Sequence, residues 1–134
     1  MTDLAEIKPV VRTLEIRHPG TGRPLGVRVS LASLDDERLA KVRRSIQDKR
    51  LYLEQRGKTF KSEEIEGNRL TILTTAITGW EWYSPTDEKA DVPEFKGEVP
   101  EFNRVNVREV LTELSWFGDQ INEALGETES FFAI

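Results

Sequence analysis

A single pair of alternating segments near the start of the chain constrains the fold more than any other feature. Residues 10–17 and 25–31 alternate apolar and polar side chains, which is the period of a β-strand with one buried face. Two glycines and two prolines within residues 18–24 favour a turn between them. The pattern therefore predicts a β-hairpin. Because an isolated hairpin is only marginally stable in water, we expect one of its faces to pack on helices.

Two helices are expected after the hairpin. Residues 33–55 place apolar side chains on one side of a helical wheel, with Ser33 as the predicted N-cap and a stop at Arg56-Gly57. Residues 62–80 also have helical periodicity, and Gly79-Trp80 would close this second helix. Its many β-branched side chains leave a strand as the alternative.

Two further helices are expected at the end of the chain. Asn106 and Glu109 have the spacing of a capping box, which predicts the start of a third helix. Residues 115–118 form a corner, and apolar side chains at intervals of three and four then predict a last helix that reaches residues 131–132. The predicted fold class is α+β and mostly helical. A single domain, residues 1–134, packs an N-terminal β-hairpin on about four α-helices.

An acidic segment between the second and third helices is predicted to be a flexible loop. Residues 84–101 contain three prolines and six acidic side chains, which disfavour regular structure. Within this region Val92-Pro93-Glu94-Phe95 recurs seven residues later as Val99-Pro100-Glu101-Phe102. Loops of this length in compact domains are usually functional or disordered.

Charge is divided unevenly along the chain. Residues 1–61 hold 14 Lys+Arg and 8 Asp+Glu, whereas residues 62–134 hold 5 and 16, within a net charge of −5. Opposite charge in the two halves predicts head-to-tail association into a homo-oligomer, although a simple division of charge without association is the alternative. The basic side chains of residues 33–55 are scattered around the helical wheel, which argues against a DNA-recognition helix. No stretch approaches the roughly 18 apolar residues of a membrane span, so neither nucleic acid nor a membrane is an expected partner.

Few residues are available for catalysis or metal binding. The chain has no cysteine, which excludes disulfides, thiolate metal sites and cysteine nucleophiles. Its one histidine, His18, lies in the predicted turn without an evident partner. The acids of residues 84–101 lack the spacing of a calcium loop, and Gly20-Thr21-Gly22 lacks the frame of a phosphate loop. We therefore expect no enzyme, no cofactor and no catalytic, cofactor-binding or metal-ligating residue.

Aromatic side chains are the best candidates for binding a protein partner. Tryptophan and phenylalanine are enriched at interfaces, where they supply large apolar contacts. We predict Trp82, Phe95 and Phe102 as partner-binding residues and assign Trp80 and Trp116 to the core.

Several short motifs follow one another in a characteristic order across residues 14–132. They are His18-Pro19 with Gly22 and Pro24-Leu25-Gly26, Leu31-Ala32-Ser33-Leu34-Asp35, Gly79-Trp80, Glu101-Phe102 before Asn106-Val107, Trp116 with Gln120, and Phe131-Phe132. In the order of these motifs, their spacing and its total length, the chain resembles the tail assembly chaperones of long-tailed bacteriophages.

The resemblance implies a non-enzymatic protein that binds the tape measure protein, a very long helical chain, and keeps it soluble. Tail tube subunits then polymerise around that chain. The resemblance also implies a longer form, made by a programmed ribosomal frameshift, whose extension recruits the tail tube protein; the present 134 residues would be the short form. The expected location is the host cell cytoplasm and not the mature virion. The alternatives are a small nucleic-acid-associated protein that uses the basic N-terminal half, and a small enzyme that uses carboxylates alone.

Overall fold

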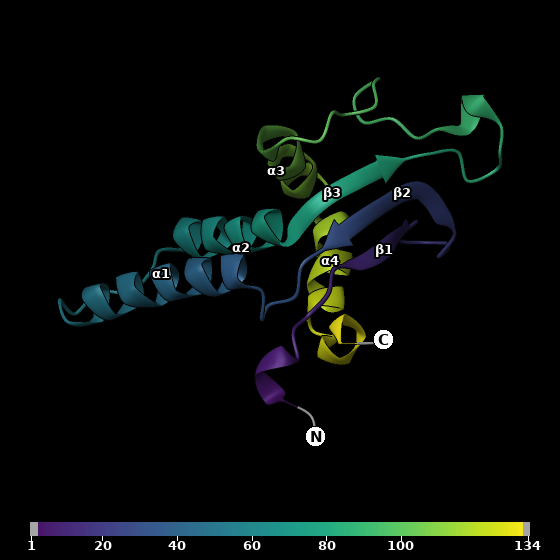
Figure 1. The fold of residues 1–134 in the computed structure, drawn as a ribbon. Coiled ribbons are helices and arrows are strands. Elements are labelled where there is room, and N and C mark those ends of the chain that lie inside the picture. Colours follow the sequence, from purple (N-terminus) through teal and green to yellow (C-terminus); the bar gives the residue numbers. More distant parts are fainter. Residues whose placement is uncertain (1–2, 133–134) are drawn as a thin grey trace.

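The computed structural model describes residues 3–132 and contains a three-stranded antiparallel sheet with helices packed on one face (Figure 1). The strands and α-helices are β1 (Arg12–Arg17), β2 (Pro24–Leu31), α1 (Glu37–Glu54), α2 (Ser62–Ala76), β3 (Ile77–Trp82), α3 (Arg104–Glu113) and α4 (Ser115–Leu125). Short 3₁₀ segments lie at Leu4–Glu6, Lys89–Asp91 and Thr128–Phe131. The predicted α+β class is confirmed, as is the N-terminal hairpin on four helices. Within residues 3–132, no helix combines the length and apolar character that a membrane crossing needs.

The sheet buries one face because its strands alternate. Val27 and Val29 of β2 lie opposite Trp82 and Trp80 of β3, and both valines are buried. Ile16 of β1 belongs to the same buried cluster. The helices complete this core with side chains from α1, α2, α3, α4 and the last 3₁₀ segment: Leu39, Leu70, Leu73, Val107, Val110, Leu111, Phe117, Ile121, Ala124, Leu125 and Phe131.

The opposite face of the sheet is polar. Arg28 of β2 lies between Glu15 of β1 and Glu81 of β3, with N–O distances of 3.1 Å and 3.8 Å. Its guanidinium also lies over the ring of Tyr83, 4.2 Å from the ring centre. Exposed ion pairs of this kind contribute little to stability, so they mark the solvent side of the sheet rather than a second core.

One end of the outer edge of β1 is occupied by a side chain instead of another strand. The carboxamide oxygen of Gln120, on α4, accepts a hydrogen bond from the backbone N–H of Arg17 at 2.8 Å. The carboxamide nitrogen of Gln120 donates to the carbonyl of Arg17 at 2.7 Å. A residue of a neighbouring antiparallel strand makes the same pair of bonds. Gln120 therefore attaches α4 to the sheet edge.

The last residues of the predicted helix 62–80 form strand β3 instead. Helix α2 ends at Ala76, and residues 77–82 pair with β2. The free edge of β2 offers backbone partners to this segment, and the pairing begins where the N–H of Ala32 donates to the carbonyl of Ala76 at 2.8 Å. Residues 77–82 are rich in β-branched and aromatic side chains, so tertiary pairing outweighs the helical period there. The helix prediction is therefore correct for residues 62–76, and the strand alternative is correct for residues 77–80.

Two helices begin at residues other than the predicted caps. The N-cap of α1 is Asp36, whose carboxylate accepts from the N–H of Arg38, whereas Ser33 is buried in the preceding turn. The N-cap of α3 is Asn103, whose side chain accepts from the N–H of Asn106 at 2.8 Å. In both cases a residue of the predicted type caps the helix three residues away from the predicted position.

The end of the chain is more broken than predicted. The expected corner at residues 115–118 is a break at Leu114 alone, and α4 begins directly at Ser115. Helix α4 ends at Leu125 instead of reaching residues 131–132, and a 3₁₀ segment follows. Phe131 is fully buried, and its carbonyl accepts a hydrogen bond from the N–H of Val10 at 2.7 Å. The chain turns after α4 because Phe131 packs back into the core.

Helices α1 and α2 form an antiparallel hairpin that projects to one side of the sheet, on the left in Figure 1. We call residues 37–67 the helical arm. Helix α1 packs mainly on α2, and Leu39, near its first turn, is its one buried residue. Val42, Ile46 and Leu53 are only half-buried along the rest of the helix. The outer part of the arm therefore lies outside the main core.

Candidate functional site

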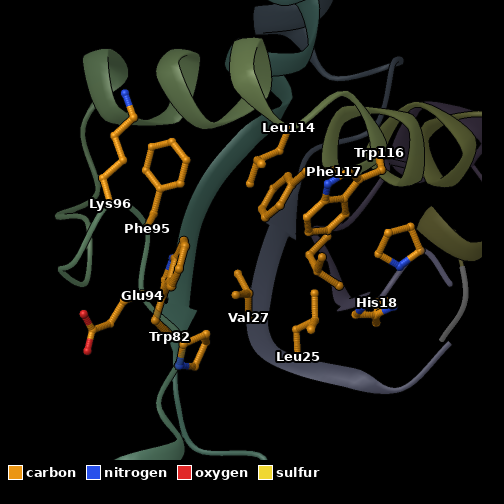
Figure 2. A pocket seen from close by; sticks show the side chains of 13 residues that line it. His18, Leu25, Val27, Trp82, Glu94, Phe95, Lys96, Leu114, Trp116 and Phe117 are labelled. Carbon is orange, nitrogen blue, oxygen red and sulfur yellow. The ribbon is translucent and has the colours of Figure 1, made fainter. Parts of the chain in front are cut away.

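An apolar cleft of about 400 Å³ lies between the sheet, the loop after β3 and the junction of α3 with α4 (Figure 2). Figure 2 shows Trp82 and Phe95 on one side, with Phe117 and Trp116 on the other. We call this site the aromatic cleft. Its lining consists of Ile16, His18, Pro19, Leu25, Val27, Trp82, Pro93, Glu94, Phe95, Lys96, Leu114, Trp116 and Phe117.

Gly26 allows the loop to approach the sheet beside the cleft. Its backbone has a φ of +95°, which favours glycine. A Cβ atom at this position would overlap the carbonyl oxygen of Tyr83. The N–H of Tyr83 donates to the carbonyl of Gly26 at 2.8 Å, so the chain leaving β3 stays against β2. The neighbouring side chains of Leu25 and Val27 are thereby left to line the cleft.

A tight turn positions Phe95. The N–H of Phe95 donates to the carbonyl of Glu98 at 2.8 Å, and the residues between them, Lys96 and Gly97, have φ values of 55° and 86°. Positive φ at both central positions is the geometry of the two-residue turns that join twisted antiparallel strands. The turn gives the acidic loop a defined shape at the wall of the cleft.

Lys96 attaches this turn to α3. Its Nζ atom lies 2.8 Å from a carboxylate oxygen of Glu109 and 2.8 Å from one of Glu113, two residues one helical turn apart. These hydrogen bonds, Glu109 first, raise the pKa of the Lys96 ammonium group. The three side chains are 43–55% exposed, so the bridge positions the loop more than it stabilises the fold.

The seven-residue repeat places two phenylalanines beside two tryptophans of β3. Phe102 packs edge-on against Trp80, with ring centres 5.7 Å apart, and the indole N–H of Trp80 donates to the carbonyl of Pro100 at 3.2 Å. Phe95, in the first copy of the repeat, lines the cleft together with Trp82. The rings of Trp80 and Trp82 are themselves 5.6 Å apart. The two copies of the repeat thus place the loop beside β3, with Phe95 near Trp82 and Phe102 against Trp80.

The structure brings together two of the three predicted partner-binding residues. Trp82 and Phe95 line the aromatic cleft, whereas Phe102 lies outside it in a separate hollow of about 250 Å³. Phe102 is 42% exposed and is connected to Trp82 only through Trp80. The cleft also contains Trp116, which the sequence assigned to the core.

Sequence reasoning missed the contribution of other elements to the cleft. Leu25 comes from the start of β2, Leu114 from the break between α3 and α4, and Trp116 from the first turn of α4. Leu25 and Trp116 belong to the motifs on which the family resemblance rests. Their place in these motifs was the one sequence feature that could have identified them as site residues. Trp80, Trp82 and Trp116 are all half-buried against the edge of the core, so the division into core and surface tryptophans did not hold.

Two polar groups of the cleft, on His18 and Trp82, differ in whether they already form hydrogen bonds. The Nδ1 atom of His18 accepts hydrogen bonds from the N–H groups of Gly20 at 2.9 Å and Thr21 at 3.1 Å, so this nitrogen holds the β1–β2 turn. The indole N–H of Trp82 is buried and has no acceptor among residues 3–132. Buried donors are normally paired, so the indole N–H of Trp82 is an unsatisfied donor within the wall of the cleft.

The lining of the cleft suits the binding of apolar surface. Ligand sites are typically concave and mainly apolar, with a few polar groups that set orientation. Within residues 3–132, no three His, Asp or Glu side chains are grouped so that they could hold a metal ion. No family model, curated protein or solved structure matches the chain, so any functional assignment depends on this cleft and on the sequence motifs.

Proposed function

We propose that this protein is a tail assembly chaperone of a long-tailed bacteriophage that binds the tape measure protein and keeps it soluble. The observation that carries the proposal is the aromatic cleft, which offers Trp82, Phe95 and Trp116 to an apolar partner. A very long helical chain exposes many apolar side chains before tail tube subunits surround it. Binding those side chains requires apolar surface and no chemistry. The motif order described above independently supports the same family.

The cleft is suited to side chains presented by a helix. Its volume of about 400 Å³ falls within the roughly 300–1,000 Å³ typical of ligand pockets, so it has room for large apolar side chains. In the helix-in-groove mode, apolar anchors three or four residues apart enter such a site. The aromatic series from Trp82 through Trp80 to Phe102 extends the contact surface beyond the cleft itself.

Weak binding by each copy is sufficient for this role. Full burial of one large apolar side chain contributes roughly 1.5–3 kcal/mol. A long partner presents many such sites, and copies of the chaperone that also contact one another act as a multivalent coat. Such an arrangement covers the partner while it is being stored and still lets tube subunits displace the copies one at a time.

The proposal includes the partners that the family resemblance implies. A longer frameshifted form would carry an extension that recruits the tail tube protein, while the short form supplies most of the coat. Both would act in the host cell cytoplasm and be absent from the mature virion.

The nucleic-acid alternative has one structural observation in its favour. Residues 50–61, at the end of the helical arm, contain four Lys+Arg and a single Glu. Nucleic-acid binding through such a surface would lose affinity steeply with salt, by roughly a thousandfold or more between low and moderate salt if six or more phosphates were contacted. Burial of apolar side chains in the cleft would show no such loss.

Co-expression with the tape measure protein of the same phage tests the proposal. We expect its soluble recovery to rise sharply in the presence of this chain. The combined Trp82→Ala, Phe95→Ala and Phe102→Ala substitutions should remove part of that gain. Each lost anchor is expected to weaken binding by roughly tenfold to a hundredfold, as the free energy of burying one side chain implies.

Single variants separate the cleft from its surroundings. Phe95→Ala should weaken binding more than Phe102→Ala, because Phe95 lines the cleft and Phe102 does not. Val105→Ala is the matched control, since Val105 is 75% exposed on α3 and lies outside the cleft. A tape measure protein that is equally soluble alone, or equally insoluble with this chain, would contradict the proposal. Equal effects of Phe95→Ala and Val105→Ala would exclude the cleft as the binding site.

A further inference from the structure

The end of the helical arm presents apolar side chains within a basic surface. Leu51, Tyr52 and Ile65 are 47%, 53% and 59% exposed, although each is large and apolar. The guanidinium of Arg56 lies over the ring of Tyr52, 4.5 Å from its centre. We call residues 50–61, together with Ile65, the arm tip. Exposed apolar side chains surrounded by charge are typical of a protein interaction surface.

The arm tip carries a net positive charge, with Arg50, Arg56, Lys58 and Lys61 against Glu54. Within residues 3–132, Arg50, Lys58 and Lys61 form no ion pair. The nearby acid Glu64 is already bound to Lys49, with an N–O distance of 3.2 Å. A partner surface that complements the tip must therefore be acidic and must contain apolar area.

Such a surface exists on the same molecule, between β1 and α4. A groove of about 480 Å³ is lined by apolar side chains that include Leu14, Trp116 and Ala124. Four carboxylates and one guanidinium also line it: Glu15, Asp119, Glu123, Glu127 and Arg17. We call it the acidic groove. Among its carboxylates, Glu123 has no ion-pair partner within residues 3–132.

We propose that the arm tip of one copy of this protein docks into the acidic groove of a second copy. The tip is a projection and the groove is concave. Their charges are opposite, and each combines a charged surface with apolar side chains. Desolvated apolar contacts inside a polar rim are the usual anatomy of a protein interface. The acidic groove adjoins the aromatic cleft and shares His18, Pro19 and Trp116 with it. The carboxylates of the groove lie outside the cleft, and the inference does not rest on binding of the tape measure protein.

The placement of the two surfaces determines the type of assembly. Figure 1 shows the arm extending to one side while β1 and its turn lie on the other, so the tip does not reach the groove of its own molecule. Each copy therefore uses two different surfaces, and the contact is heterologous. Repetition of a heterologous contact produces a ring or an open helical array.

Sedimentation of the purified chain tests self-association without any partner. At about 0.1 M salt we expect an average mass well above the 15.4 kDa of the monomer. At about 1 M salt the mass should fall, because the screening length shortens from about 10 Å to about 3 Å. A chain that is monomeric at low salt and high protein concentration overturns the proposal.

Charge reversal on each surface identifies the contact. The arm variant combines Arg50→Glu with Lys58→Glu, and the groove variant combines Glu123→Arg with Glu127→Arg. Each alone should weaken self-association by at least about tenfold, since like charges then oppose each other at the contact. The substituted side chains are exposed, and the one ion pair lost, between Glu127 and Arg12, is a surface pair of little energetic weight. Unchanged melting temperatures would confirm that both variants fold.

An equimolar mixture of the two variants is the decisive sample. The arm variant has an acidic tip, which fits the basic groove of the groove variant. The groove variant keeps its basic tip, which fits the acidic groove of the arm variant. Both contacts of an alternating assembly are therefore restored, and the mass at low salt should return to that of the unmodified chain. Folded variants whose mixture remains monomeric overturn the proposal.

A control and a competing partner complete the experiment. Lys8→Glu with Lys89→Glu makes the same change in net charge away from both surfaces and should leave the mass unchanged. If this control reduces the mass as much as the arm variant does, net charge rather than the proposed contact controls association. If the chain is monomeric but binds a DNA or RNA duplex through Arg50 and Lys58, the arm tip is a nucleic-acid surface and the proposal fails.

Discussion

At the scale of single residues, Asp36 shows how one carboxylate fixes the start of the arm. It accepts a hydrogen bond from the backbone N–H of Arg38 at 2.9 Å and from the guanidinium of Arg38 at 3.0 Å. The guanidinium has the largest effect, and together these bonds hold the pKa of Asp36 below its ordinary range. A carboxyl group with a lowered pKa stabilises the fold in its ionised form, so its contribution is present at neutral pH and is lost in acid.

We expect Asp36→Ala to reduce the free energy of unfolding by about 0.5–2 kcal/mol at pH 7, as is usual for loss of an N-cap. This difference should shrink as the pH falls through the lowered pKa of Asp36, below about pH 4. Urea denaturation at pH 7 and at pH 3 measures both quantities. Asp35→Ala is the matched control, because within residues 3–132 the Asp35 carboxylate accepts no hydrogen bond. A penalty that does not change with pH would show that ionisation of Asp36 is not involved.

At the scale of elements, the sequence correctly predicted the helices and strands that depend on nearby residues. The β-hairpin and the interiors of four helices follow from hydrophobic period and from turn residues, and both are confirmed. Strand β3 was predicted as helix because its formation depends on the free edge of β2, about 50 residues earlier in the chain. The alternation in Trp80-Glu81-Trp82 was the local sign of this strand. The hydrophobic periodicity of one segment does not show whether that segment pairs with a strand far away in the sequence.

The candidate site was predictable to a similar extent. Trp82 and Phe95 were identified because aromatic side chains are enriched at protein interfaces, and the cleft contains both. Phe102 looked equivalent, since it occupies the same place in the repeat as Phe95. The two differ because Trp80 and Trp82, their neighbours on β3, occupy different surroundings. Sequence spacing showed the repeat but not which copy faces the cleft.

The acidic loop after β3 should be the first segment that a protease cuts. Residues 85–91 are exposed, whereas the turn at Lys96 is attached to α3. Brief digestion with a glutamate-specific protease should therefore cleave first after Glu88, as mass spectrometry of the fragments would show. The Glu109→Gln and Glu113→Gln substitutions together should accelerate cleavage after Glu98. A first cut after Glu54, the last residue of α1, would instead mean that this end of α1 is less ordered than the loop.

At the scale of the whole molecule, burial is concentrated at one end. Helices α3 and α4 contribute eight buried residues: Val107, Val110, Leu111, Phe117, Gly118, Ile121, Ala124 and Leu125. Helix α1 is longer than either of them but buries Leu39 alone. Local stability follows the number of buried apolar contacts, so the molecule combines a stable body with a weakly held arm.

This distribution predicts the order of amide hydrogen exchange. In about 1 M salt, which weakens association between charged surfaces, the second half of α1 should exchange at least about tenfold faster than α4. Exchange followed by mass spectrometry of peptides resolves the two helices. Residues 40–43 of α1, which follow buried Leu39 and are the first with intrahelical acceptors, provide the internal comparison and should be better protected than residues 50–54. Uniform protection along α1 would show that the arm unfolds only together with the body.

The bonds between Gln120 and Arg17 have a consequence for aggregation. A sheet edge with free N–H and C=O groups is a template on which other extended chains can add, and natural proteins protect such edges. Here the carboxamide of Gln120 takes the place of the next strand at one end of β1. Beyond the other end of β1, the N–H of Val10 is held by the carbonyl of Phe131. These bonds hinder the addition of a fourth strand beside β1. We therefore expect that a protein proposed to work beside insoluble chains does not seed their deposition through this edge.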